Sequence, residues 1–444
     1  MSKNGMSKSG FQTLRGMRDI LPADIGRWQA VEDPTRATFE SYGFEELRLP
    51  LLEDTRLFKR GVGEATDIVE KEMFSFPSRD DGEGDKEKTS LTLRPEGTAS
   101  CVRALQQHGL LYNQTQRVWY RGPMFRYERP QKGRYRQFEQ IGAEVFGMAG
   151  PAVEAELIAM CADTFATLGV LEHVELQLNT LGSGAARIAY REALVGYLEP
   201  LLAELDEDSQ RRINTNPLRI LDSKNTRTQE IIQSAPQLPD FVDDEAKEHF
   251  DKLQGLLTEL GIGFRLNTGL VRGLDYYTHT VFEWVTTQLG AQGTVCAGGR
   301  YDGLVELLGG KPTPGAGFAM GVDRLVLLHE EVHGEAMDGS GLLAGPVDLY
   351  VAIADDAALG YCLTLARQIR NALPGVRVRS HVGGGKLKSQ MKKADTCGAR
   401  FALIVGADEV RDSAVTCKAL REGDEPAQAT MAVQDLADYL RARL

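Results

Sequence analysis

FRYERPQKGRYRQFEQ, residues 125–140, crowds positive charge around a Pro-Gln-Lys-Gly turn. Its basic residues are Arg126, Arg129, Lys132, Arg134 and Arg136. On either side, Val118–Glu128 and Gln137–Phe146 have the length and the aromatic and β-branched content of strands. We therefore predict two antiparallel strands joined by a basic loop.

The two faces of this hairpin differ in chemistry, because successive side chains of a strand point to opposite sides. On the second strand, Ile141 and Val145 share an apolar face that suits a protein core. The opposite face carries Phe138, Gln140, Gly142 and Glu144. A solvated sheet face with cross-strand ion pairs would account for this pattern, but a glycine at position 142 would also let a ligand approach the backbone. The hairpin alone leaves both interpretations open.

The charge of the hairpin contrasts with that of the whole chain. The 444 residues carry a formal net charge of -12, which argues against a polyanionic partner unless positive charge is localised. Residues 117–137 hold seven basic side chains against one acidic, and residues 376–400 hold the same numbers. Two such islands predict two separate contacts with a polyanion.

Length and composition predict about three domains of roughly 150 residues in a globular protein. We expect residues 1–12 to be a disordered tail, residues 183–260 to be a helical insertion and residues 333–345 to be a linker. Residues 346–444 alternate strand and helix patterns, so they predict a small α/β domain with a mixed sheet.

Two further features of the sequence predict the cellular compartment of the protein. No run approaches the roughly 18 apolar residues that a membrane-spanning helix needs, so we expect no membrane contact. The six cysteines are scattered and form no CxxC pair. This pattern indicates reduced thiols and a cytoplasmic protein.

Three local features carry expectations about secondary structure. Asp24–Tyr42 has a helical pattern, and Pro34 within it predicts a kink or a restart. Phe44–Leu52 alternates like a strand, and Asp80–Lys88 is charged and glycine-containing, as in a solvated loop.

Two polar segments add candidate binding groups. In TLRPEGT, residues 92–98, Glu96 and Thr98 could accept hydrogen bonds from an ammonium group, although capping of the following helix by Thr98 is an alternative. In LVRGLDYY, residues 270–277, Arg272 lies close to two tyrosines. Polar groups at this density are hard to satisfy in a dry core.

Two glycine-rich segments lie further along the chain, GGRYDG at residues 298–303 and GAGFAMGVDRL at residues 315–325. Glycines in such segments permit close approach of other groups to the backbone. The spacing does not match the dinucleotide-binding fingerprint, and HVGGGK at residues 381–386 is not a phosphate-binding P-loop.

Together and in this order, these segments resemble the histidyl-tRNA synthetases. FRYER and RQFEQ resemble motif 2 of class II aminoacyl-tRNA synthetases, and GVDRL resembles motif 3. LVRGLDYY and GGRYDG resemble the two signatures specific to histidine. The resemblance runs from about Thr13 to the C-terminus.

The resemblance implies an α+β fold in two parts. A class II catalytic domain over residues 13–332 would have an antiparallel sheet flanked by helices, with the helical insertion at about 183–260. Residues 346–444 would be an anticodon-binding α/β domain with a mixed sheet. Members of the family are usually homodimers through motif 1, which would lie around Pro50.

It also implies an activity. Such an enzyme makes histidyl-adenylate from L-histidine and ATP with Mg²⁺, and then transfers the histidyl group to its cognate tRNA. By resemblance Arg126 would hold the α-phosphate, Arg324 the γ-phosphate, and Arg272 the reacting carboxylate or the α-phosphate. Arg272 and Arg126 would therefore be the catalytic residues, and both would also contact histidine. No metal ligand is assigned.

The remaining roles follow from the same resemblance. The ammonium group of histidine would be held by Glu96, Thr98 and Gln140. The imidazole would be read by Glu144 and Tyr277, with Tyr276 nearby. Adenine would stack on Phe138, and its amino group would meet Glu128. The tRNA would be contacted by Arg129, Lys132, Arg134 and Arg136 at the acceptor end and by Lys386, Lys388, Lys392 and Lys393 at the anticodon.

Two alternative functions would predict a different set of features. The regulatory paralogue of ATP phosphoribosyltransferase looks different, because it lacks the anticodon domain and an intact LVRGLDYY segment. A non-catalytic domain that senses tRNA would be expected to lose Arg126, Arg272 or Arg324. This chain retains all of these features.

Overall fold

The computed structural model describes residues 10–64, 66–78, 90–223, 225–290, 293–334, 347–421 and 427–444. The expected tail, the charged loop at 80–88 and the expected linker therefore lie wholly or largely outside the described residues. The chain divides into two compact units, one made of Met1–Ile20 and Arg27–Ala336 and the other of Leu21–Gly26 and Met337–Leu444. The domain boundaries expected from the sequence stay predictions.

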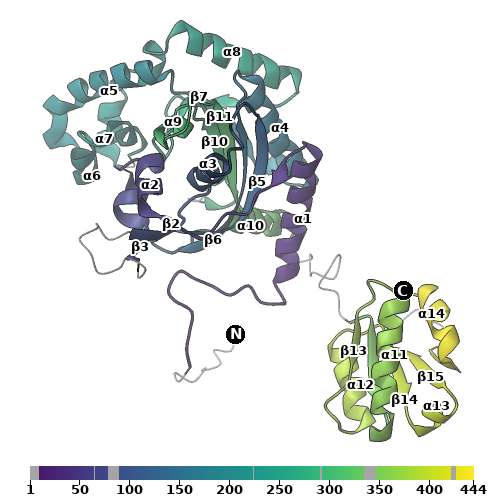
Figure 1. Cartoon of the computed structure of the whole chain (residues 1–444). Coiled ribbons are helices and arrows are strands. Elements are labelled where there is room, and N and C mark those ends of the chain that lie inside the picture. Colours follow the sequence, from purple (N-terminus) through teal and green to yellow (C-terminus); the bar gives the residue numbers. More distant parts are fainter. Residues whose placement is uncertain are drawn as a thin grey trace. The chain divides into compact units, whose positions relative to one another are not determined.

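An eight-stranded sheet organises the larger unit (Figure 1). Its strands, in spatial order, are β1 (Glu45–Glu46), β5 (Gln116–Phe125), β6 (Gln137–Phe146), β11 (Gly315–Gly321), β10 (Thr294–Arg300), β9 (Thr278–Val285), β7 (Glu175–Thr180) and β8 (Arg265–Leu266). Every neighbouring pair from β5 to β7 is antiparallel, and only the edge strands β1 and β8 pair in parallel. A second sheet has the order β2 (Leu52–Asp54), β4 (Ser90–Leu93) and β3 (Phe74–Pro77).

The helices of the larger unit cover the two faces of the large sheet or lie beside it. They are α1 (Ile25–Ser41), α2 (Thr55–Val62), α3 (Thr98–Gln107), α4 (Ala152–Thr167), α5 (Gly184–Leu198), α6 (Glu207–Arg212), α7 (Thr226–Ile232), α8 (Asp244–Glu259), α9 (Leu304–Leu307) and α10 (Val322–His333). Short stretches of 3₁₀ helix lie at Leu171–His173, Glu199–Glu204, Pro217–Asp222 and Leu238–Asp240, and a π-helical turn lies at Ile68–Glu72.

The predicted hairpin is present, and its faces differ as expected. β6 has the predicted bounds, whereas β5 ends at Phe125, three residues earlier than expected. Ile141 and Val145 join the core that α1, α4, α8 and α10 cover. The alternate residues of β6 face the other side of the sheet, where Phe138 and Phe146 pack in a second core with α3 and α5.

Two expectations near the N-terminus concern Pro34 and the segment that follows α1. Helix α1 continues through Pro34, so the predicted restart is absent, and the predicted kink stays a prediction. Phe44–Leu52 is not one continuous strand, because Glu45–Glu46 form β1, Leu52 begins β2, and the residues between them belong to neither. The middle of this segment is held by Arg94, whose side chain is 2% exposed and donates to the carbonyl oxygens of Leu49 and Pro50.

The segment expected to be a helical insertion contains α5 to α8, which connect β7 to β8. In Figure 1, α5, α6 and α7 gather beside one end of the large sheet. Leu253 and Leu257 of α8 pack against α4 in the first core. Residues of α5 belong to the second core, on the other face of the sheet. The insertion therefore makes apolar contacts on both faces of the large sheet.

The smaller unit has a mixed sheet, as predicted. Its order is β13 (Val378–Ser380), β12 (Leu349–Ile353), β14 (Phe401–Val405), β15 (Ala414–Ala419) and β16 (Gln428–Ala432). Its helices are α11 (Leu359–Ala372), α12 (Leu387–Thr396), α13 (Ala407–Arg411) and α14 (Val433–Arg441), with a 3₁₀ turn at Asp356–Ala358. Among the described residues of either unit, no helix has the length and apolar character needed to cross a membrane.

Helix α8 offers a test of this packing. Leu257→Ala would remove a fully buried side chain, so we expect it to lower the free energy of unfolding by about 2–5 kcal/mol. Leu260→Ala, three residues on at a side chain that is 54% exposed, should change it by less than about 0.5 kcal/mol. Urea unfolding can be followed by tryptophan fluorescence, because all three tryptophans are buried in the larger unit. Equal losses in the two variants would contradict the packing.

Candidate active site

A cavity of about 170 Å³ opens on the face of the large sheet that carries the alternate residues of β6. It brings together segments that are far apart in the sequence. Its polar and aromatic lining includes Glu96, Thr98, Tyr120, Arg126, Glu128, Arg134, Tyr135, Phe138, Gln140, Arg272, Tyr276, Tyr277, Thr294, Asp323 and Arg324. All the residues expected to bind histidine or ATP line it, except Glu144, which lies directly beneath.

Glu96 caps the helix that borders this cavity. Its two carboxylate oxygens accept hydrogen bonds from the backbone N–H groups of Thr98 (2.7 Å) and Ala99 (2.9 Å) at the start of α3. The alternative in which the Thr98 side chain caps the helix is wrong, because its hydroxyl donates to Glu144 (2.7 Å). Burial raises the pKa of Glu96, and the helix N–H groups oppose that effect.

Glu144 is a buried carboxylate that three hydroxyl groups satisfy. Thr98 and Tyr120 donate to Oε1, the latter at 3.0 Å, and Tyr301 donates to Oε2. Burial raises the pKa of Glu144 to about 8, and the hydroxyl donors only partly offset it. Burial thus favours the protonated form of this carboxyl near neutral pH.

Three glycines make room for this arrangement. A Cβ at Gly97 or Gly142 would lie 2.2 Å or 2.5 Å from the ring of Tyr120. A Cβ at Gly317 would collide with the Glu144 carboxylate. The expectation that Gly142 admits a ligand is therefore wrong, since the space above it is filled by a tyrosine ring.

Arg126 is held at the cavity by neighbours on three sides. Its Nε donates to the carbonyl of Pro95 (2.9 Å), its guanidinium lies 5.3 Å from the centre of the Phe138 ring, and Nη1 is 4.0 Å from Glu128. Burial lowers the pKa of Arg126, although guanidinium groups stay protonated in proteins. The geometry leaves a cation facing the cavity.

Arg272 and Arg324, which also line the cavity, are anchored differently. Arg272 forms an ion pair with Glu283 of β9. Burial works against its charge, but attraction to Glu283 and two tyrosines outweighs burial and raises the pKa of Arg272. Arg324 donates to the carbonyl groups of Gly133 (3.2 Å) and Thr294 (2.6 Å), so its guanidinium bridges the basic loop and β10.

Two atoms at the cavity have unused hydrogen-bonding capacity. Oε1 of Gln140 and Nε of Arg272 are buried and have no hydrogen-bond partner among the described residues. Buried polar atoms are nearly always paired in folded proteins. An unpaired acceptor and an unpaired donor in one cavity indicate a ligand that supplies both.

The residues expected to contact tRNA divide into three groups. Arg134 lines the cavity and pairs with Glu128, and Arg136 stacks on Tyr127 at 3.7 Å. Arg129 and Lys132 are exposed on the same loop. In the smaller unit, the exposed lysines at and within α12 are Lys386, Lys388, Lys392 and Lys393.

Several residues at the cavity received no role from the sequence. Tyr120, Tyr135, Asp323 and the β10 segment Thr294–Ala297 line the cavity, and Glu283 pairs with the lining residue Arg272. Glu283 had a detectable signal, because it is a lone carboxylate within the apolar strand VFEWV. Asp323 had another, because it stands next to Arg324 in GVDRL.

Residues 16–325 match the family model described as histidyl-tRNA synthetase, and residues 348–443 match the one described as an anticodon binding domain. The chain belongs to the histidyl-tRNA synthetase family. The apo S. aureus histidyl-tRNA synthetase is 34% identical, with 97% of this chain and 99% of that chain covered and a TM-score of 0.77. Family membership assigns the chain histidine–tRNA ligase activity with ATP as a substrate.

Two further solved structures share the fold. The histidyl-tRNA synthetase from Nostoc sp. PCC 7120 is 20% identical, covers 98% of this chain and 100% of its own, and has a TM-score of 0.65. A protein from Bacillus halodurans C, described as an ATP phosphoribosyltransferase regulatory subunit/histidyl-tRNA synthetase, is also 20% identical. It covers 89% of this chain and 98% of its own, with a TM-score of 0.62. At these identities the likeness concerns the fold alone.

The buried carboxyl of this synthetase gives a pH test. Glu144 loses its proton at about pH 4.5 in an unfolded chain and at about pH 8 in the folded one. Over that range the unfolded state is the more ionised, so this group makes the folded state less stable as pH rises. We expect Glu144→Gln to remove this contribution to the pH dependence of stability. The free energy of unfolding in urea should then fall less between pH 5 and pH 8 than it does in the wild type. The exposed substitution Glu40→Gln is the control. An unchanged pH dependence in Glu144→Gln would contradict the raised pKa.

Proposed function

We propose that the cavity binds L-histidine beside ATP and forms histidyl-adenylate there. One observation carries the proposal: three arginines, Arg126, Arg272 and Arg324, surround a cavity whose floor is the buried carboxyl of Glu144. Three cations suit a triphosphate and a carboxylate, because the guanidinium fork binds such oxygens bidentately and keeps its charge.

The ammonium group of histidine would be held by acceptors near the start of α3. Support comes from Gln140, whose buried Oε1 lacks a partner among the described residues. Glu96 and Thr98 also line the cavity and retain lone pairs beyond the hydrogen bonds that they already make. These three groups would orient the amino acid so that its carboxylate points toward the arginines.

The imidazole would meet Glu144 and Tyr277, with Tyr276 packed against Tyr277 at 4.7 Å. A pocket that hydrogen-bonds both ring nitrogens leaves its own buried groups unpaired when an apolar amino acid enters. Such a site rejects the wrong substrate by about 10⁴- to 10⁵-fold without a separate editing site. Specificity for histidine would therefore rest on these residues.

ATP would occupy the side of the cavity formed by motif 2. Adenine would stack on Phe138, and its amino group would donate to the Glu128 carboxylate. In the free protein this carboxylate forms an ion pair with Arg134. Binding of ATP at this position would release Arg134. Arg126 would hold the α-phosphate, and Arg324 the γ-phosphate.

The chemical step needs no covalent enzyme intermediate. A carboxylate oxygen of histidine would attack the α-phosphorus in line, the bond to the bridging oxygen would break, and pyrophosphate would leave. Arg272 and Arg126 would lower the repulsion between the carboxylate and the phosphate and stabilise the charge of the transition state. The free Nε of Arg272 could donate to either reacting group.

Magnesium would enter with the triphosphate. Among the described residues no three His, Cys, Asp or Glu side chains form a group that could hold a metal ion. The described residues thus offer no dedicated metal site, and we assign no step to Mg²⁺. It would be bound mainly by phosphate oxygens, as Mg²⁺ usually is in nucleotide sites.

We further propose the following for the other partners. Arg129, Lys132, Arg134 and Arg136 would approach the acceptor end of the cognate tRNA, and Lys386, Lys388, Lys392 and Lys393 its anticodon. A homodimer would form around Pro50. A cytoplasmic location would suit the six free thiols, five of which are buried.

Arg272→Ala tests the catalytic assignment. We expect it to lower histidine-dependent ATP–pyrophosphate exchange by at least about 10²-fold, the usual cost of losing one donor to a transition-state charge. Arg272→Ala leaves the Glu283 carboxylate without its ion-pair partner. The double variant Arg272→Ala with Glu283→Gln removes that uncompensated charge and should still be inactive, because the arginine is absent. Arg265→Ala, at an exposed pair with Glu175, is the matched control. Near-normal exchange by Arg272→Ala, with an unchanged melting temperature, would refute the assignment.

Salt dependence tests the tRNA surface on α12. Each lost phosphate contact should reduce the slope of log affinity against log salt by about one. We therefore expect Lys388→Gln with Lys392→Gln to weaken tRNA binding and to reduce the slope by about two. Arg411→Gln, on an exposed position of the same unit, is the control. A slope equal to that of the wild type would show that α12 does not contact the tRNA backbone.

A further inference from the structure

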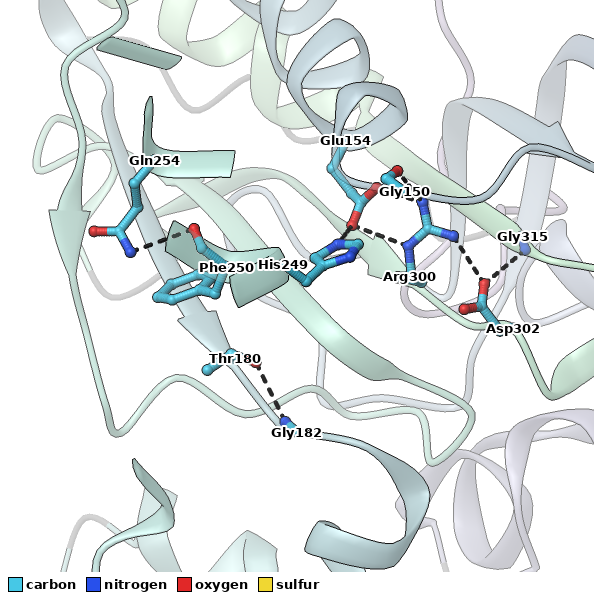
Figure 2. Close-up of polar contacts among 10 residues, drawn as sticks. All are labelled: Gly150, Glu154, Thr180, Gly182, His249, Phe250, Gln254, Arg300, Asp302 and Gly315. Carbon is cyan, nitrogen blue, oxygen red and sulfur yellow. Dashed lines mark hydrogen bonds and ion pairs between the residues drawn. The ribbon is translucent and has the colours of Figure 1, made fainter. Parts of the chain in front are cut away.

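A buried ion network lies behind the cavity and includes a histidine of the insertion. Glu154 of α4 is 0% exposed, and its carboxylate oxygens accept three hydrogen bonds. Arg300 at the end of β10 donates through Nε (3.0 Å) and Nη2, and His249 of α8 contacts Oε1 through Nε2 (2.6 Å). Figure 2 shows these side chains converging from three elements.

The network is fully ionised at its centre. Burial opposes the charged form of Glu154, but hydrogen bonds from His249 and Arg300 outweigh it and lower the pKa of Glu154 to about 2. Separating the members of a buried, fully hydrogen-bonded charge pair is costly, because loss of one partner leaves the other uncompensated. Its members therefore keep a defined position.

Arg300 uses its remaining donors to fix the residue that follows it. Nη2 also donates to the carbonyl of Gly150 (2.8 Å), and Nη1 donates to Asp302 (2.9 Å). The same Asp302 oxygen accepts the N–H of Gly315 (3.0 Å), as Figure 2 shows. Tyr301 thus lies between two anchored side chains, and its own N–H donates to the carbonyl of Gly315 (2.8 Å).

Tyr301 carries this constraint into the cavity. Its hydroxyl donates to Glu144, and its ring packs edge-on against Tyr276 at 5.4 Å. Both contacts involve residues that we propose to surround the imidazole of histidine. A change in the orientation of Tyr301 would therefore change the position of the Glu144 carboxyl beneath the cavity.

His249 connects the same network to the insertion. It lies one turn before Leu253 on the face of α8 that packs against α4. Its ring is 5.4 Å from that of His279, whose backbone N–H donates to Gly182 and whose carbonyl accepts from Leu181, just where the insertion begins. His249 is therefore in contact with the core and lies next to the entry of the insertion.

We propose that His249 is a positioning residue that acts through Glu154, Arg300 and Tyr301 to orient Glu144, so that the docking of α8 sets the affinity of the cavity for histidine. The proposal rests on the assignment of Glu144 to the imidazole. It adds a residue of the insertion, outside the cavity, to those that determine substrate binding.

The test is histidine-dependent ATP–pyrophosphate exchange with full-length protein. We expect His249→Ala to raise KM for histidine about tenfold, the size expected for one hydrogen bond to a charged group. KM for ATP should change little, whereas the melting temperature should fall, because the change removes one partner of a buried carboxylate. His249→Gln, which places an amide donor near the position of Nε2, should recover most of the affinity for histidine. His333→Ala is the matched control, because its Nε2 contacts a backbone carbonyl, that of Leu168, rather than a buried carboxylate.

A second comparison asks whether the effect passes through Tyr301. In a Tyr301→Phe background, His249→Ala should raise KM for histidine by less than about twofold, because residues that act through one contact are non-additive. Additive effects would overturn the proposal, and so would an unchanged KM for histidine in His249→Ala or an equal rise in both KM values. A wild-type protein without histidine-dependent exchange would overturn the proposed function itself and this inference with it.

Discussion

The carboxyl of Glu144 lies beneath the cavity and accepts hydrogen bonds from three hydroxyl groups, those of Thr98, Tyr120 and Tyr301. A buried carboxyl is costly unless it is hydrogen-bonded, so the surrounding elements must deliver those groups accurately. They come from α3, from β5 and from the turn after β10. The positions of three elements around the cavity thus depend on satisfying one side chain.

Space is a second constraint on the same carboxyl. Glycines at positions 97, 142 and 317 have no Cβ, and each omission admits either the Tyr120 ring or the carboxylate of Glu144. Glycine normally weakens a strand. Here its cost is offset by hydrogen bonds that could not otherwise form, because two rings and a carboxyl share a narrow layer above the sheet.

The arginines around the cavity follow a common principle. Arg126 and Arg324 donate to backbone carbonyls, and Arg272 pairs with Glu283. These contacts hold each cation in place before a substrate arrives, so little reorganisation is needed when negative charge develops. The acidic total of the chain is compatible with this, because the positive charge is concentrated at the cavity, on the hairpin loop and on α12.

Local sequence patterns determined the hairpin strand Gln137–Phe146, the two chemistries of its faces, the helices between β7 and β8 and the mixed sheet of the smaller unit. They did so because alternation and helical periodicity are properties of neighbouring residues. Only the tertiary structure decided that Leu49 and Pro50 are held by Arg94 between two short strands, that Gly142 admits Tyr120 and not a ligand, and that His249 reaches Glu154. Those outcomes depend on contacts between residues about 22 to 95 positions apart, and no short window of sequence contains them.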